Sequence, residues 1–171
     1  MAVLPIRVFP DPILKEKAAP VERAQEVSGL IDDLLDTMRN APGGVGIAAP
    51  QVGASLRIIL VDVSAHRRGS REPNHGLLAL VNPEILAMGG QQIVREGCMS
   101  VPEYTANVRR AEWVLVNALD RNGERTILEA AGFEAVAIQH EIDHLDGILF
   151  LDRVASVKDD LFRRKKSRQG S

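Results

Sequence analysis

The chain has 171 residues, of which 45% are hydrophobic and 26% charged, a balance typical of ordinary globular proteins. This length predicts a single domain over residues 1–171, with a basic tail from about residue 162. The net charge of −2 gives no overall attraction to nucleic acid, so DNA is not an expected partner. No apolar run approaches the ~18 residues that span a bilayer, and no signal or transit pattern opens the chain, so the cytoplasm is the expected location.

The first half of the chain predicts a helix followed by strands. From Val27 to Met38, apolar residues lie three and four positions apart, which predicts an amphipathic helix. The glycine-rich segment Gly43 to Gly53 predicts a loop or an irregular strand. Runs of aliphatic and β-branched residues then predict strands at Leu56 to Val63 and Leu77 to Ile85. The polar, turn-rich stretch between these strands, residues 66–75, is expected to be an exposed loop.

The second half predicts a hairpin and one more helix. Asn122-Gly123, between Trp113–Leu119 and Thr126–Leu128, is a strong hairpin signal. Helical spacing returns from Phe133 to Leu145, and Gly147 is placed to end that helix. The chain closes on a basic segment that is expected to fray.

The segment Gln139 to His144 contains the pattern H-E-x-x-H. Its histidines, His140 and His144, lie four residues apart and therefore on one side of a helix, where they can share a metal ion. Glu141 lies beside them, in reach of a water molecule on that ion, as a hydrolytic general base must be. The alternative is a solvated, charged helix. Since the histidines continue the apolar stripe that begins at Phe133, they are expected to face inward, where unpartnered polar groups are costly, and this favours metal binding.

A catalytic divalent ion usually takes three protein ligands and leaves one position for water. No histidine follows His144, and the acidic candidates downstream are Asp146, Asp152, Asp159 and Asp160. Upstream, the single cysteine, Cys98, follows Gly97, a residue that lets other groups approach the backbone closely. A lone cysteine is more often a buried, inert thiol. Ligation by Cys98 would complete a Cys-His-His site.

Three segments resemble, in order and spacing, the signature motifs of the peptide deformylase family: GVGIAAPQ (44–51), EGCMS (96–100) and QHEIDH (139–144). The resemblance extends over nearly the whole chain before the tail. It implies a hydrolase that acts during protein biosynthesis, in which it removes the N-formyl group from the N-terminal methionine of nascent polypeptides and releases formate. It also favours a bacterial cytoplasm over an organelle as the location.

The resemblance implies a role for each matching residue. Metal ligands would be Cys98, His140 and His144, and Glu141 would be the catalytic acid and base. The side chain of Gln51 and the backbone N–H of Met99 would stabilise the oxyanion. Substrate contacts would come from Val45, Gly46, Gly97, Met99 and Val136. As a separate hypothesis, Arg110 pairs with Glu96 and so supports the metal ligands from behind.

The resemblance also suggests a cofactor and a fold. A site with a thiolate and two imidazoles suits several ions, and the resemblance implies Fe²⁺ in the cell, with Zn²⁺, Ni²⁺ or Co²⁺ as substitutes in purified protein. The expected fold is α+β, with antiparallel strands around a central H-E-x-x-H helix at Phe133–Leu145, an N-terminal amphipathic helix and a C-terminal helix or tail. A substrate peptide would add as a strand beside Gly44 to Ile47.

Some positions differ from the family pattern, and other notable residues lie outside the family motifs. Ile47 and Met99 replace the usual leucines, and both changes conserve volume. In some relatives an arginine helps hold the substrate backbone at the position that aligns with Thr105, and this chain lacks it there. His66 and His75 are interpreted as surface histidines. The basic tail predicts a solvated end, with docking on ribosomal RNA as a further hypothesis; its basic residues are Arg163, Arg164, Lys165, Lys166 and Arg168.

Two rival functions compete with this interpretation. An H-E-x-x-H endopeptidase would share the helix motif, but it would leave the glycine-rich and cysteine motifs without a role. A non-catalytic metal-binding module would share the fold, and the loss of Glu141 would be its expected mark. Glu141 is present in this chain.

Overall fold

Two antiparallel sheets form the framework of the protein, whose computed structural model describes residues 2–164. The larger sheet has the order β1-β2-β3-β6-β7 and consists of β1 (Gly46–Ala48), β2 (Ile58–Val61), β3 (Leu78–Gly89), β6 (Trp113–Leu119) and β7 (Arg125–Ala131). The smaller sheet has the order β4-β5-β8 and consists of β4 (Gln92–Cys98), β5 (Val101–Arg110) and β8 (Leu161–Arg163). All pairings between these strands are antiparallel, so the predicted mixed fold with antiparallel sheets is confirmed.

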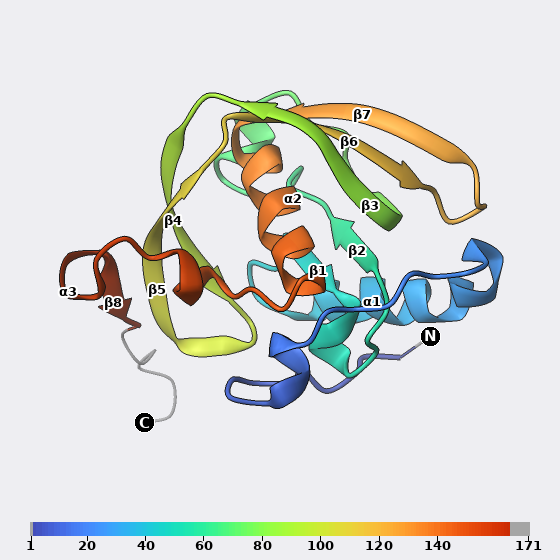
Figure 1. Ribbon diagram of the computed structural model, residues 1–171, viewed down its shortest axis with the longest axis horizontal. Coiled ribbons are helices and arrows are strands. Elements are labelled where there is room, and N and C mark those ends of the chain that lie inside the picture. Colours follow the sequence, from blue (N-terminus) through green and yellow to red (C-terminus); the bar gives the residue numbers. More distant parts are fainter. Residues whose placement is uncertain (1, 165–171) are drawn as a thin grey trace.

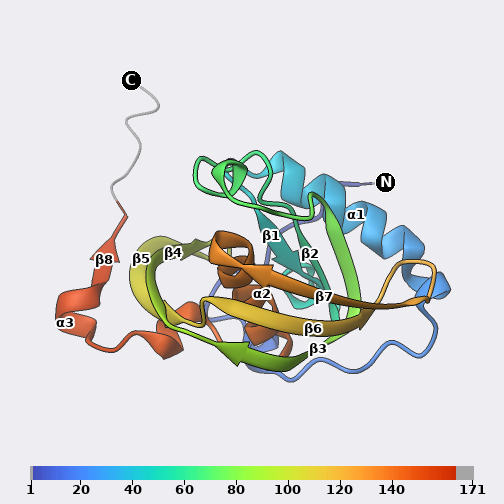
Figure 2. The same ribbon diagram turned by 90° about the horizontal axis from the view of Figure 1, so that it is seen from above.

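The α-helices are α1 (Ser28–Asn40), α2 (Gly132–Leu145) and the short α3 (Val157–Asp160). α2 runs through the middle of the molecule, between the larger sheet and the strands β4 and β5 (Figures 1 and 2). α1 covers the other side of β1 and β2. Within residues 2–164, no helix is both long enough and apolar enough to cross a membrane.

Strand β2 separates two hydrophobic cores. All four of its residues are buried, and successive residues of a strand face opposite sides of the sheet. Ile59 and Val61 pack in the core around α2, whereas Ile58 and Leu60 pack in the core under α1. Burial of each such side chain contributes ~1.5–3 kcal/mol. Cover on both faces therefore explains why this strand reads as a continuous aliphatic run in the sequence.

Helix α2 is buried on nearly all sides and corresponds to the helix predicted from Phe133 to Leu145. It ends at the predicted position, because the Gly147 N–H donates to the His144 carbonyl at 3.2 Å and Gly147 has a φ of 73°. A Cβ at this position would overlap the Lys15 carbonyl, so only glycine fits. The cap fixes where the chain leaves the helix that carries both histidines.

The predicted hairpin is present between β6 and β7. Gly123 adopts a φ of 82°, which favours glycine, and the Asp120 carboxylate accepts the backbone N–H groups of Asn122 and Glu124 at 2.8 and 3.0 Å. Strand β7 extends on both sides of the predicted stretch Thr126–Leu128. The turn residues therefore located the hairpin, and cross-strand pairing lengthens it.

The smaller sheet was not predicted. Polar and charged residues interrupt both β4 and β5. The burial of β4 alternates along the strand, but residue type does not follow it, because the apolar Ile93 is exposed and the charged Glu96 is buried. Pairing between β4 and β5 runs from Gln92↔Arg110 to Cys98↔Val101. These two strands are therefore stabilised by pairing with each other, which the local sequence pattern does not predict.

The C-terminal segment also differs from its prediction. Fraying is expected from about residue 162, yet Leu161–Arg163 pairs with β5 as strand β8. The Arg95 guanidinium lies 3.7 Å from the centroid of the Phe162 ring, and this cation–π contact helps to hold the strand in place. The prediction is wrong up to residue 164. The rest of the basic tail, Lys165, Lys166 and Arg168, lies outside the described residues.

Candidate metal centre and substrate pocket

Three side chains from two separate elements converge on one point. The Cys98 Sγ and a ring nitrogen of each of His140 and His144 all lie within 4.8 Å of one another. Metal bonds to nitrogen and sulfur are about 2.0–2.3 Å long, so ligand atoms around a tetrahedral ion lie about 3.3–3.8 Å apart. The distance of 3.3 Å between Cys98 Sγ and His144 Nε2 matches this spacing. Among residues 2–164, none of the downstream aspartates joins the group.

The local structure determines the direction of these three side chains. His140 and His144 lie one turn apart on α2, with ring centroids 5.0 Å apart. Cys98 is the last residue of β4, and the register between β4 and β5 shifts between Glu96 and Cys98. Such an irregularity redirects a side chain relative to regular pleating. Here it accompanies a thiol that faces the histidines on α2.

A buried chain of charged groups holds the site from behind. Glu96 Oε1 lies 2.7 Å from His140 Nδ1, which leaves the other ring nitrogen for the metal position. Arg110 donates to both oxygens of Glu96 at 2.7 and 2.8 Å and to Asp143 at 2.6 Å. Burial acts to raise the pKa of Glu96, but hydrogen bonds from Arg110 and His140 outweigh it and lower this pKa to about 2. The expected ion pair between Glu96 and Arg110 is therefore present, and Glu96 is ionised.

Glu141 is only 3% exposed, and its Oε1 has no hydrogen-bond partner among the described residues. This oxygen lies 3.8 Å from His144 Nε2, beside the candidate metal position. Burial raises the pKa of Glu141 to about 7. A Cβ at Gly46 would overlap the Glu141 carboxylate, which explains why glycine is required there. An unpartnered buried carboxylate is costly, and it fits a site that is completed by an ion and a water molecule.

Gln51 presents an amide to the same point. It lies in a 3-10 helix, Ala49–Val52, and its Oε1 accepts the Ala48 N–H at 2.9 Å. This bond orients the side-chain NH₂, which donates to Ser100 Oγ at 3.1 Å and lies 3.5 Å from Cys98 Sγ. The amide is therefore fixed beside the candidate metal position.

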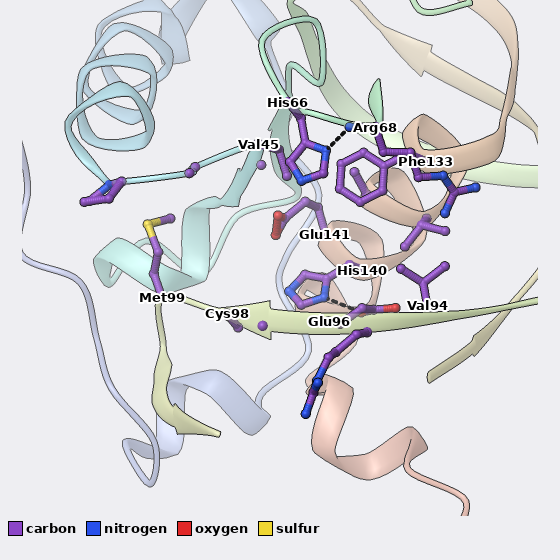
Figure 3. A pocket seen from close by; sticks show the side chains of 18 of the residues that line it. Val45, His66, Arg68, Val94, Glu96, Cys98, Met99, Phe133, His140 and Glu141 are labelled. Carbon is purple, nitrogen blue, oxygen red and sulfur yellow. Dashed lines mark hydrogen bonds and ion pairs between the residues drawn. The ribbon is translucent and has the colours of Figure 1, made fainter. Parts of the chain in front are cut away.

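The centre opens into a pocket of about 490 Å³ between β1 and β4 (Figure 3). Figure 3 shows His140 and Glu141 between the Val45 segment above and the β4 strand below. All five residues expected to contact substrate line this pocket: Val45, Gly46, Gly97, Met99 and Val136. Gln51, Glu96 and Cys98 also line it, whereas His144 and Arg110 are buried and are not among its lining residues.

The sequence analysis missed part of this pocket. His66, interpreted as a surface residue, lines the pocket and stacks on Phe133 with ring centroids 4.1 Å apart. Its Nδ1 accepts the Arg68 N–H at 3.1 Å, and burial, together with the nearby Arg68 charge, lowers its pKa. No local signal distinguishes His66 from a surface histidine, because its position depends on how the whole loop docks.

That loop docks on the first turn of α2, where backbone N–H groups lack helical partners. Glu72 accepts the Phe133 N–H at 3.1 Å, and the buried Glu134 pairs with the backbone and ring of His75 at 2.7 and 2.5 Å. His75 is thus partly exposed, as predicted, but it lies apart from the metal centre. Most residues of the loop are exposed, as predicted, and the loop also caps the helix that carries His140 and His144.

These features define a class of protein: a metal-binding hydrolase in which a helix with two histidines faces a cysteine at the end of an antiparallel strand. The family model described as polypeptide deformylase matches residues 3–160. The chain belongs to the peptide deformylase family.

Individual relatives agree with this assignment. The peptide deformylase of Thermodesulfovibrio yellowstonii is 47% identical over 169 residues, which cover 96% of this chain and 97% of the relative. A crystal structure of a peptide deformylase from Legionella pneumophila is 41% identical, with a TM-score of 0.80 over 92% of this chain and 89% of that one. An actinonin-bound peptide deformylase from Acinetobacter baumannii is 40% identical, with a TM-score of 0.78 over 91% of this chain and all of that one (100%).

Proposed function

We propose that this chain removes the N-formyl group from the N-terminal methionine of nascent polypeptides and releases formate. Family membership over residues 3–160 supports this function. The single observation that carries the mechanism is the convergence of Cys98, His140 and His144 beside the unpartnered carboxylate of Glu141 in an open pocket. This arrangement is what hydrolysis of a small amide requires.

Cys98, His140 and His144 are the proposed ligands of one divalent ion. An ion held there would act as a Lewis acid and lower the pKa of a water molecule toward neutrality. Thiolate and imidazole ligands suit several ions, and we propose Fe²⁺ in the cell, with Zn²⁺, Ni²⁺ or Co²⁺ as substitutes in purified protein. Glu96, held by Arg110, fixes the ring of His140 so that its free nitrogen faces the ion.

Glu141 is the proposed proton shuttle. Its carboxylate accepts the proton of the attacking water, and the protonated acid then gives this proton to the leaving amine. Both transfers need a carboxyl group whose pKa lies near neutral pH, and burial raises that of Glu141 to about 7. Its unpartnered oxygen is free to take the proton because no neighbouring side chain in the described part of the chain occupies it.

Gln51 and Met99 are the proposed oxyanion donors. Attack on the formyl carbon places a negative charge on its oxygen, and fixed N–H groups stabilise that charge without reorganisation. The Gln51 amide is already oriented by Ala48 before substrate arrives. Met99 follows Cys98 directly and lines the pocket, and its backbone N–H is the proposed second donor. Loss of one such donor typically costs ~10²–10³ in rate.

A substrate peptide is proposed to enter as an extra strand. β1 and β4 are edge strands of their sheets, and both border the pocket. Their unpaired backbone groups offer hydrogen bonds to an extended chain, as in β-augmentation. Val45 and Val136 supply apolar surface for the methionine side chain, and Gly46 and Gly97 leave room for the backbone.

The wider setting follows from the substrate. We propose a single catalytic domain over residues 1–171 that acts in the bacterial cytoplasm, where formylated chains emerge from ribosomes. Docking of the basic tail on ribosomal RNA stays a separate proposal. Deletion of the residues after Arg164 is expected to weaken ribosome co-sedimentation if the tail docks, and unchanged co-sedimentation would remove this proposal.

Formate release from matched peptides tests the function. The protein loaded anaerobically with Fe²⁺ or Ni²⁺ is incubated with formyl-Met-Ala-Ser and with acetyl-Met-Ala-Ser, and the products are identified by mass spectrometry. Rapid release from the formyl peptide alone is expected. Cleavage at an internal peptide bond would instead indicate an endopeptidase, and no product with a fully loaded metal site would indicate a non-catalytic module.

A further inference from the structure

Arg164, the residue that follows strand β8, places a positive charge at the pocket. β8 pairs with β5 through Thr105↔Phe162, and the Arg164 N–H just beyond it donates to the Glu103 carbonyl at 2.7 Å. The Arg164 side chain turns back over β4, where a Cβ at Gly97 would overlap its Nη2, and it lines the pocket. Arg164 thus lies beside Gly97, although it comes 66 positions after Cys98 in the chain.

A second arginine, Arg95, holds β8 in place and so helps to position Arg164. The Arg95 guanidinium packs over the Phe162 ring at 3.7 Å, and its Nε donates to Thr105 Oγ1 at 3.2 Å. These contacts tie β8 to both other strands of its sheet. Arg164 therefore projects from an anchored strand, which reduces the conformational freedom that an exposed arginine must give up on binding.

Among residues 2–164, the Arg164 guanidinium has no carboxylate partner, because none of the ion pairs in this part of the chain involves it. Its Nη2 lies against Gly97, in the space that a Cβ at this position would occupy. Guanidinium carries five N–H donors and no acceptor. Beside Gly97 these donors face the edge of β4, along which an entering peptide would lie.

We propose that Arg164 binds the substrate peptide after its formylmethionine, through a main-chain carbonyl oxygen of the following residues. This inference rests on the proposed function, because it requires a peptide between β1 and β4. A carbonyl oxygen accepts two hydrogen bonds, and a planar guanidinium can donate both. Thr105, the position where some members of the family have an arginine, lies on the same side of Gly97: a Cβ at Gly97 would come within 3.5 Å of Thr105 Cγ2 as well as against Arg164 Nη2. The C-terminal strand thus supplies a cation at a place where β5 does not.

Steady-state kinetics on two substrates test this role. Formyl-Met-Ala-Ser has main-chain carbonyl groups after its methionine residue, which the proposed contact with Arg164 requires, whereas formyl-methionine amide has none. In Arg164→Ala we expect KM for the tripeptide to rise about tenfold, the factor that 1.4 kcal/mol gives, with kcat unchanged. KM for the amide is expected to stay at the wild-type value. Arg163→Ala, one residue earlier on β8 and outside the pocket wall, is the matched control and is expected to change neither substrate.

Binding of the product peptide gives a second measurement. Calorimetry with Met-Ala-Ser is expected to show weaker binding to Arg164→Ala and partial recovery in Arg164→Lys, which keeps the charge but not the planar fork. Equal losses on both substrates, or no loss on the tripeptide, would overturn the role of Arg164. Failure of the wild-type protein to release formate from either substrate would instead refute the proposed function.

Discussion

Glu141 is the proposed acid and base of the reaction. Its carboxylate is buried beside the candidate metal position. It fills the space that a Cβ at residue 46 would need, so the glycine at that position makes room for it. We predict that Glu141→Gln lowers kcat for formate release by roughly 10²–10⁴, the usual contribution of a positioned acid or base. Metal content, measured on the same samples, is expected to stay unchanged because Glu141 is not among the three ligands.

A matched substitution on the same helix controls for damage to α2. Glu134 is also buried, but it pairs with His75 away from the metal centre. Glu134→Gln is therefore expected to lower thermal stability while it keeps most of kcat. If Glu134→Gln lost as much activity as Glu141→Gln, the special role of Glu141 would not stand.

His66 provides a test of electrostatics at the pocket. Burial and then the Arg68 charge lower its pKa, so its ring is expected to be neutral at pH 7 and to titrate below its ordinary value of about 6.5. Because the folded-state pKa lies below the unfolded one, the effect of His66 on stability becomes less favourable as the pH falls through that range. NMR titration of the imidazole in wild type and in Arg68→Ala measures both contributions. A wild-type His66 with its ordinary pKa would contradict the expected effect of burial and of Arg68.

The sequence predicted the candidate metal ligands better than the other residues around the pocket. Cys98, His140 and His144 belong to short motifs whose spacing reflects chemistry, and the structure brings them together. His66 and Arg164 belong to polar stretches that look solvated in any local window. Their place at the pocket depends on the docking of a loop and a terminal strand, which no local pattern encodes.

At the scale of elements, a charged network joins α2 to the smaller sheet. Arg110 on β5 contacts Glu96 on β4 and Asp143 on α2, and all three are buried. We predict that Arg110→Ala lowers the free energy of unfolding by up to about 3–5 kcal/mol, because it removes the cation that two buried carboxylates share. Glu96 keeps its contact with His140, and Asp143 keeps its pair with Arg153. Urea denaturation measures this change.

The neighbouring exposed residue Arg109 supplies the control for that experiment. Arg109 lies on the same strand with its side chain in solvent, so Arg109→Ala is expected to change stability by less than about 0.5 kcal/mol. Similar losses in the two variants would mean that the network contributes no more than an ordinary surface arginine.

Elements with a strong periodic pattern were predicted well. α1, α2 and the β6–β7 hairpin follow helical spacing or a turn signal, and all three lie near their predicted bounds. Strands β4, β5 and β8 have mixed polar and apolar residues, and their order comes from partners distant in the chain. Their location therefore depends on tertiary pairing, which single-sequence patterns do not carry.

At the scale of the whole molecule, two sheets present their edge strands to one helix. β1 ends the larger sheet and β4 ends the smaller one, and α2 lies behind the pocket between them (Figures 1 and 3). The candidate metal ligands come from both sides of this junction, because Cys98 belongs to β4 and the histidines to α2. Metal binding is therefore expected to couple the smaller sheet to the helix.

That coupling predicts a dependence of stability and activity on the metal and its oxidation. The protein loaded with Fe²⁺ is expected to lose formate-releasing activity during aerobic incubation, because a thiolate next to iron is prone to oxidation, whereas the Ni²⁺ form keeps its activity. Removal of the ion by a chelator is expected to lower the melting temperature, since a bound ligand stabilises the folded state. Full activity of the iron form after prolonged exposure to air would contradict the first expectation.

The most direct test of the account is a titration of the metal-free protein with Co²⁺, in which formate release from formyl-Met-Ala-Ser is measured at each addition. The account predicts that the rate rises in proportion to added Co²⁺ and reaches a plateau at one ion per chain, because Cys98, His140 and His144 form one site. A rate that does not depend on the ion, or a plateau reached only with several ions per chain, would contradict it.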